Sequence, residues 1–333
     1  MTPKKVLLPQ PIESEALLML EEAGIEIVSS PDPSPETVRP LLAGAQGIVL
    51  RTGIKITREL LSHAGDLQIV SRTGGGLDNV DVGAATERGV VVTSNLGVNT
   101  SSVVEHVLAF MLALSKQLFR MDREVRDGNF AIRYQNLSGD VRGKTLGVIG
   151  FGRIGSELGR LCRQTFGMKV LAFDPFLPEE VKETYGDWVH FPDIRELCSN
   201  ADVISIHVPF TDRTRNMMGE QELSWMKPEA ILINTSRGSL IDEDALFHVL
   251  KEKKIAGAGL DVFSKEPVPA DNPLLGLDNI LLSPHSAALT RECVIRMATE
   301  AVQCVIDLFA GLEPKNVANR QVLALEKWKH LGV

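Results

Sequence analysis

The chain has 333 residues, 44% hydrophobic and 23% charged, and 35 Lys and Arg against 43 Asp and Glu give a net charge of −8. This composition excludes a collagen-like, low-complexity or largely disordered chain. The length predicts two domains of roughly 100–200 residues each, and the acidic balance argues against nucleic acid as the main partner.

The amino-terminal segment and the cysteines indicate a cytoplasmic protein. Only three apolar residues, Val6–Leu8, precede Pro9, which is too short a run for a signal peptide. No stretch approaches the roughly 20 apolar residues of a membrane helix, so we expect no membrane partner. The cysteines form no C-x-x-C pair and have no histidine at ligand spacing, so we expect reduced thiols and no metal site. They are Cys162, Cys198, Cys293 and Cys304.

The first hundred residues repeat one pattern, a short apolar run followed by a polar turn and a helical period. Amphipathic stretches such as Glu13–Ala23 and Pro35–Ala43 lie between the apolar runs. Alternating strands and helices predict a parallel sheet covered by helices on both faces. The predicted strands are Val6–Leu8, Ile25–Val28, Ile48–Leu50, Leu67–Val70 and Val90–Val92.

A long apolar helix is predicted after this series. Ser102 and Glu105 have the spacing of a capping box, and the apolar stretch Val103–Phe119 follows. Its length and apolarity suggest burial between layers or at a subunit contact. Residues 127–142 lose the helical period and are predicted to form a loop.

A second series of strands and helices fills the rest of the chain. Another apolar helix, Glu292–Phe309, follows it, and the last twenty residues form a short tail. The chain is therefore predicted to be α/β, with two parallel-sheet domains. The strands of this series are Leu146–Ile149, Val170–Phe173, Val203–Val208, Ile231–Thr235, Ala258–Val262 and Ile280–Ser283.

The first strand of the second series runs into G-x-G-x-x-G, formed by Gly150, Gly152 and Gly155 around Arg153 and Ile154. The first glycine permits a tight turn, the second lets the backbone approach a pyrophosphate, and the third lets the helix pack closely on the strand. Asp174 ends the next strand, 19 residues on, where a carboxylate binds the ribose hydroxyls of NAD and repels the phosphate of NADP. We therefore predict NAD as cofactor; the alternative is a tight glycine turn between packed elements.

Six motifs in order make the chain resemble the D-2-hydroxyacid dehydrogenase family, and within it the phosphoglycerate dehydrogenase branch. They are Ser71–Asp81, the glycine motif, His207–Thr214, Asn234–Gly238, Gly259–Pro267 and Ser283–His285. The resemblance implies two Rossmann-like or flavodoxin-like domains, with an NAD-binding domain at 100–286 inserted into a substrate domain at 1–99 and 287–333. No regulatory domain of the long phosphoglycerate dehydrogenases is expected here.

Oxidation of a 2-hydroxy acid needs a base, a cation for the carboxylate and a dry pocket. His285, which follows an apolar strand, is predicted to be the acid/base. Glu266 is predicted to orient its ring and stabilise the imidazolium. Arg237 is predicted to hold the substrate, because its planar fork matches a carboxylate. The resemblance also implies that six residues line the cofactor. They are His207, Pro209, Thr214, Thr235, Ser236 and Asp261.

Successive backbone N–H groups in the loop of Gly74, Gly75 and Gly76 are predicted to form an anion-binding nest, with a flexible hinge as the alternative. The resemblance implies that this loop binds the substrate carboxylate. Arg51, Arg72 and Arg133 are predicted to add positive charge, which suits a substrate with a second anion; solvated surface arginines are the alternative. The resemblance suggests that Arg133 reaches a neighbouring subunit's site. Ala288 stands where the family usually has glycine or serine, which alters the pocket edge.

The leading hypothesis is an NAD-dependent D-2-hydroxyacid dehydrogenase acting on 3-phosphoglycerate, a small anionic substrate. A glyoxylate or hydroxypyruvate reductase is the alternative within the class, and an NAD-sensing, corepressor-like interaction protein is the alternative outside it. The family dimerises through the NAD domain, so a homodimer with the helix Val103–Phe119 at the contact is expected.

Overall fold

The computed structural model describes residues 3–135 and 137–332. It divides into two compact units, Met1–Asn99 with Leu289–Val333, and Thr100–Ala288. The second division falls two residues after the predicted boundary at 286. Both units are built on parallel sheets, so the predicted fold class is confirmed.

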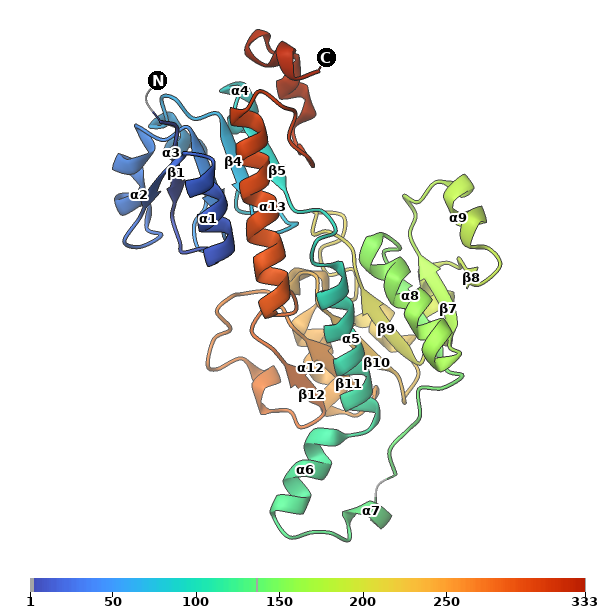
Figure 1. The fold of residues 1–333 in the computed structure, drawn as a ribbon. Helices are drawn as coiled ribbons and strands as arrows, with labels where there is room; N and C mark the ends of the chain where they lie inside the picture. The colour runs from blue at the N-terminus through green and yellow to red at the C-terminus, as the bar shows by residue number, and fades with distance from the viewer. Residues whose placement is uncertain (1–2, 136, 333) are drawn as a thin grey trace. The chain divides into compact units, whose positions relative to one another are not determined.

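The first unit has a five-stranded parallel sheet in the order β2-β1-β3-β4-β5. Its strands alternate their buried side chains between two cores: Val6 and Leu8 face helices α1 and α13, while Leu7 faces α2, α3 and α4. Helices α1 and α13 lie side by side although the chain between them is long (Figure 1). The strands are β1 (Lys5–Leu8), β2 (Glu26–Ser29), β3 (Gly47–Leu50), β4 (Ile69–Arg72) and β5 (Val91–Ser94). The helices are α1 (Ser14–Glu22), α2 (Pro35–Leu42), α3 (Arg58–Ser62), α4 (Val82–Glu87) and α13 (Arg291–Phe309), followed by the 3-10 helices Arg320–Ala324 and Glu326–Gly332.

The second unit has a seven-stranded parallel sheet in the order β12-β11-β10-β9-β6-β7-β8. The chain leaves β6 toward β7 and returns to β9 on the other side, so β6 and β9 form the switch point where such sheets bind ligands. The strands are β6 (Thr145–Ile149), β7 (Lys169–Phe173), β8 (Val189–His190), β9 (Val203–Ile206), β10 (Ile231–Asn234), β11 (Gly257–Leu260) and β12 (Ile280–Leu282).

Helices cover both faces of this second sheet. One face carries α5 (Thr100–Ser115) and α8 (Arg153–Phe166), which lie beside each other (Figure 1). The other face carries three shorter helices. They are α10 (Ile194–Asn200), α11 (Glu220–Ser224) and α12 (Glu243–Lys251). The peripheral elements are α6 (Leu118–Arg126), α7 (Ile132–Gln135), α9 (Glu179–Tyr185) and the 3-10 helices Gly238–Leu240 and Pro273–Gly276.

The apolar helix predicted at Val103–Phe119 is wrong in two respects. Helix α5 begins at Thr100, so Ser102 lies inside the helix, is buried, and is not the capping residue. The helix also ends at Ser115, and Gln117, with φ +51°, turns the chain into α6. Helices α6 and α7 extend away from the sheet (Figure 1), and the second of them lies inside the segment predicted to be a loop.

No single helix of the described residues is long and apolar enough to cross a bilayer; only α5 and α6 taken together pass by length and composition, with a 56° bend between them. The apolar face of α5, with Val104, Val107 and Met111, packs in the core of the second unit. All four cysteines are free and buried. Burial raises the pKa of Cys162 and Cys198 to about 12 and that of Cys304 to about 11, so these thiols stay protonated at neutral pH.

Candidate active site

The turn after β6 has the shape of a dinucleotide loop. Gly150 has φ +92°, and a Cβ there would lie 2.7 Å from the His207 carbonyl oxygen. A Cβ at Gly155 would lie 2.2 Å from the Gly150 carbonyl oxygen, so α8 can approach β6 only through a glycine. Around Gly152, the residue before α8, a Cβ would meet nothing within 4 Å. The turn is therefore tight on its inner side and open where a pyrophosphate would approach the helix.

Asp174 lies next to this loop, directly after β7. Its Oδ2 accepts a hydrogen bond from the Phe151 N–H at 3.0 Å, and its Oδ1 accepts one from the Phe176 N–H at 3.1 Å. The carboxylate is thus held beside the glycine turn, where a ribose would follow the pyrophosphate. Arg153, the first residue of α8, is exposed, and Ile154 packs partly against the core.

If Asp174 rejects the 2′-phosphate, the Asp174→Asn substitution lowers the preference for NADH over NADPH about tenfold, because the repulsive charge is removed. The ratio of kcat/KM with the two cofactors measures this, together with dissociation constants from nucleotide fluorescence. Asp187→Asn, on an exposed turn of the same unit, is the matched control. Equal use of both cofactors by the unmutated protein would contradict the role of Asp174.

Strand β10 ends in the loop that carries Arg237. Asn234 braces this loop from inside: its side chain donates to the Arg237 carbonyl at 2.8 Å and accepts from the Ser236 N–H at 3.0 Å. The Ser236 hydroxyl donates to the Val208 carbonyl at 3.1 Å. The Thr235 hydroxyl is buried and finds no hydrogen-bond partner among the described residues. Because buried polar atoms are nearly always partnered, this orphan hydroxyl fits a site that a ligand completes.

His285 and Glu266 are in direct contact. The His285 Nδ1 lies 2.7 Å from the Glu266 Oε2, and the other carboxylate oxygen, Oε1, accepts the Phe263 N–H at 3.0 Å. The His285 side chain is 42% exposed and that of Glu266 is 36% exposed. The pair is thus open to solvent on one side, and Nε2 is the imidazole nitrogen left to exchange a proton with a substrate.

Asp261 follows β11 and is 1% exposed. Its carboxylate accepts hydrogen bonds from the Ser283 hydroxyl and from the N–H groups of Ser286 and Ala287. A carboxylate offers about four acceptor positions, so one remains for a cofactor amide. The sequence gives no signal for the bonds that Asp261 makes to the residues around His285, because they join residues more than twenty positions apart.

His207 directly follows β9 and lies next to the glycine turn. Its N–H donates to the Ile149 carbonyl at 2.7 Å. Its Nε2 lies 2.9 Å from the Ser205 hydroxyl. Pro209 and Thr214 close the following loop on itself, since the Thr214 hydroxyl donates to the Pro209 carbonyl at 2.9 Å. Desolvation lowers the pKa of His207 from 6.5 to about 4, so this ring is neutral at physiological pH.

This lowered pKa predicts acid sensitivity of the fold. In the unfolded chain His207 binds a proton below pH 6.5, whereas in the folded chain it does so only near pH 4. The stabilisation that is present above pH 6.5 is therefore lost as the pH falls. The loss by pH 4.5 is about 2 kcal/mol. Denaturant unfolding at pH 7.5 and 4.5 should show a smaller pH effect on stability for His207→Gln than for the wild type, with His190→Gln, at an exposed residue of β8, as control. An unchanged pH effect would contradict it.

The predicted substrate residues of the first unit gather at the carboxyl ends of its strands. Asn79 connects them: it accepts from the Arg72 Nε at 3.1 Å and donates to the Arg51 carbonyl at 3.0 Å. Gly74 lies against the Arg72 guanidinium, where a Cβ would be 2.6 Å from Nη1. Gly75 follows in the same loop, with the Asn95 carbonyl nearby.

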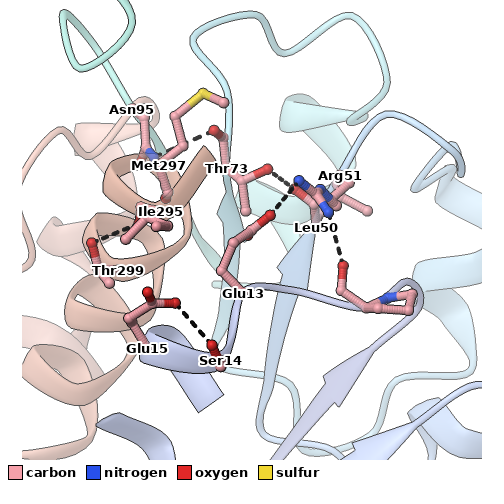
Figure 2. A network of polar contacts seen from close by, with 11 residues as sticks. Glu13, Ser14, Glu15, Leu50, Arg51, Thr73, Asn95, Ile295, Met297 and Thr299 are labelled. Carbon is pink, nitrogen blue, oxygen red and sulfur yellow. Dashed lines mark hydrogen bonds and ion pairs between the residues drawn. The ribbon is translucent and has the colours of Figure 1, made fainter. Parts of the chain in front are cut away.

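Arg51 is already paired in the structure. Its Nη2 donates to the Glu13 Oε1 at 2.9 Å (Figure 2). Its Nη1 donates to the Pro11 carbonyl at 3.0 Å. Glu13 is a partner that the sequence does not predict, because the spacing of the two residues gives no signal. Arg133 lies in the other unit, on α7, and its guanidinium stacks at 4.6 Å on each of the rings of Phe130 and Tyr134.

Comparison with known proteins identifies the family. Residues 108–287 match the family described as D-isomer specific 2-hydroxyacid dehydrogenase, NAD binding domain. The chain belongs to the D-isomer-specific 2-hydroxyacid dehydrogenase family. This confirms the predicted family and its NAD-binding domain.

Within residues 3–135 and 137–332, no three His, Cys, Asp or Glu side chains converge as a metal site.

Relatives named for different activities share the same sequence identity with this chain. The D-3-phosphoglycerate dehydrogenase of Archaeoglobus fulgidus is 38% identical, over 95% of this chain and 59% of that protein. The glyoxylate reductase of Korarchaeum cryptofilum is also 38% identical, over 87% of this chain and 88% of that protein. The crystal structure of Aquifex aeolicus D-lactate dehydrogenase with NAD and lactic acid is 32% identical, with a TM-score of 0.81 over 92% of this chain and 96% of that one. The chain thus spans about three fifths of the phosphoglycerate dehydrogenase it matches.

Proposed function

We propose that this protein is an NAD-dependent oxidoreductase that interconverts a D-2-hydroxy acid and the corresponding 2-oxo acid. The observation that carries this proposal is the 2.7 Å contact between His285 and Glu266, in the same unit as the glycine turn. When bound, NAD supplies the hydride acceptor, and its reduced form the donor. The chain's own residues then have to bind the carboxylate and move one proton.

In this proposal, Arg237 binds the substrate carboxylate, and the His285 Nε2 takes the hydroxyl proton or returns it. Glu266 accepts the Nδ1–H, which fixes the tautomer and balances the charge that the ring gains. Asp174, the glycine turn and Thr235 hold the cofactor. The Gly74–Gly75 loop and Arg72 of the first unit remain predicted substrate residues.

A substrate panel tests the reaction class. We expect NADH-dependent reduction of glyoxylate, hydroxypyruvate or 3-phosphohydroxypyruvate, and the reverse oxidation of glycerate or 3-phosphoglycerate. Tight NADH binding without turnover of any 2-oxo acid would instead support the corepressor-like alternative.

Two substrate classes remain candidates within this function. The phosphorylated one, 3-phosphoglycerate, is supported by Arg51 and Arg72 beside the glycine loop and by the phosphoglycerate dehydrogenase relatives. The one without phosphate, glyoxylate or hydroxypyruvate, is favoured by the ion pair between Arg51 and Glu13, because a neutralised guanidinium attracts a second anion less.

The Glu13→Gln substitution separates these candidates. Removing the carboxylate frees the Arg51 charge, so the kcat/KM for 3-phosphohydroxypyruvate relative to hydroxypyruvate is expected to rise about tenfold. Glu15→Gln is the matched control, since the Glu15 carboxylate bonds Ser14 instead (Figure 2). An unchanged ratio would mean that Arg51 does not meet the phosphate.

A homodimer through the NAD domain and a cytoplasmic location belong to the same proposal. Six apolar side chains on α6, on α7 and in the adjoining loops are more than half exposed. Such exposure is typical of a surface that a partner covers. We therefore place the subunit contact on this segment rather than on α5. The side chains are Leu118, Phe119, Val125, Phe130, Tyr134 and Leu137. The four reduced, buried thiols suit a reducing compartment.

A further inference from the structure

Asp261 holds the backbone that carries His285 through three hydrogen bonds. The His285 N–H donates to the Asp261 carbonyl at 2.7 Å, and the next two N–H groups, of Ser286 and Ala287, donate to the two carboxylate oxygens at 2.8 and 2.9 Å. His285 itself has φ +52°, in the left-handed backbone region that residues other than glycine rarely adopt. Such a conformation persists only where surrounding bonds enforce it, and here three successive bonds converge on one residue.

A chain of hydrogen bonds links this carboxylate to helix α5. The Ser283 hydroxyl lies 2.5 Å from the Asp261 Oδ1, and the His106 Nε2 lies 2.9 Å from the same hydroxyl and 3.8 Å from Oδ1. Ser283 has one hydroxyl proton, which it donates to Asp261. Ser283 therefore accepts from His106, whose imidazole carries a proton on Nε2.

The position of the His106 ring is built into the packing of α5. The ring meets the edge of Phe110, one turn further along the helix, with the centroids 4.6 Å apart and the planes at 79°. Phe110 in turn lies on Gly259 of β11, where a Cβ would be only 2.8 Å from the phenyl ring. Helix α5 thus lies close enough to β11 and β12 for His106 to reach Ser283, which follows β12 and precedes the turn that carries His285.

We infer that His106 is a positioning residue for His285. Its Nε2–H bonds Ser283, Ser283 orients the Asp261 carboxylate, and that carboxylate holds the N–H groups that follow His285. The inference rests on the proposed role of His285 as acid/base. It requires only one hydrogen-bond donor at the end of the side chain, and not an imidazole as such.

A pair of substitutions at position 106 tests this. Glutamine places an N–H₂ donor near the position of the imidazole Nε2, whereas leucine has similar size and no donor. We expect His106→Leu to speed amide hydrogen exchange of the peptide 283–288 about tenfold and to lower kcat about tenfold, since one hydrogen bond is lost. His106→Gln should keep both near the wild-type values. His190→Leu, at an exposed residue of β8, is the matched control.

Three results would overturn the inference. The first is wild-type exchange of peptide 283–288 in His106→Leu. The second is a change in exchange rate and kcat in His106→Gln equal to that in His106→Leu, which would show that the hydrogen-bond donor does not position His285. The third is an equal rise of exchange in β9, which would mean general destabilisation. A wild-type protein that reduces no 2-oxo acid would defeat the proposed function, while the exchange comparison would still decide whether His106 holds the loop.

Discussion

Replacing His285 with alanine is expected to lower kcat for 2-oxo acid reduction by about 10²- to 10⁴-fold, the usual contribution of a positioned acid or base. The dissociation constant of NADH should change less than about twofold, because the glycine turn and Asp174 lie on other strands of the sheet. Steady-state kinetics and fluorescence titration with NADH measure the two effects. His248→Ala, on the exposed side of α12, is the control, and an unchanged kcat in His285→Ala would remove His285 from the mechanism.

The partner of this histidine gives a second variant for the same test. Both Glu266 oxygens accept hydrogen bonds, one from the Phe263 N–H and one from the imidazole. A glutamine has one acceptor oxygen for these two donors, so Glu266→Gln leaves one donor facing an N–H₂ group and removes the charge opposite the ring. We expect an intermediate loss of kcat, about tenfold to a hundredfold. A loss equal to that of His285→Ala would mean that Glu266 acts as more than an orienting partner.

The sequence predicts the fold well because each rule that it uses is local. Runs of β-branched residues separated by helical periods require parallel strands with helices on both faces, and the two sheets follow from that alternation. The glycine turn is likewise local, since Gly150, Gly152 and Gly155 each meet a backbone requirement within one strand-turn-helix unit.

Local rules also explain where the sequence analysis went wrong. Ser102 and Glu105 have the capping-box spacing, but the helix starts three residues earlier than the predicted Val103, because the apolar face of α5 packs on the sheet from its beginning, with Val103 and Val104 buried. Packing of a buried face outweighs a capping preference of about 1 kcal/mol. The end of the same helix was missed because Gln117, which turns the chain, is not a residue type that marks breaks.

In each unit, the contacts that tune the candidate site residues join residues far apart in the chain. Glu13 meets Arg51 across 38 positions, and His106 meets Ser283 across 177. Both depend on strand order and on how closely a helix approaches the sheet, which periodicity does not specify. Arg51 was therefore predicted as a free substrate cation, whereas it is half of an ion pair.

Gly238 shows how tightly the loops of the candidate site are joined. A Cβ at this position would lie 1.8 Å from the carbonyl carbon of Phe263 and 2.2 Å from the backbone nitrogen of Ser264. That backbone cannot retreat, because the Phe263 N–H is bonded to Glu266 and the Ser264 N–H to Glu243. The Arg237 loop and the loop leading to Glu266 therefore touch only because residue 238 has no side chain.

Gly238→Ala is consequently expected to lower the free energy of unfolding by about 3 kcal/mol or more, the upper range for overpacking where neighbours cannot move. It should also lower kcat, because relief of the clash displaces Glu266, Arg237 or both. Gly276→Ala is the control: a Cβ there meets nothing within 4 Å, so its effect should stay within about 0.5 kcal/mol. Denaturant unfolding of the two variants decides the matter, and equal stability would mean that the two loops are free to separate, leaving Arg237 and Glu266 positioned independently.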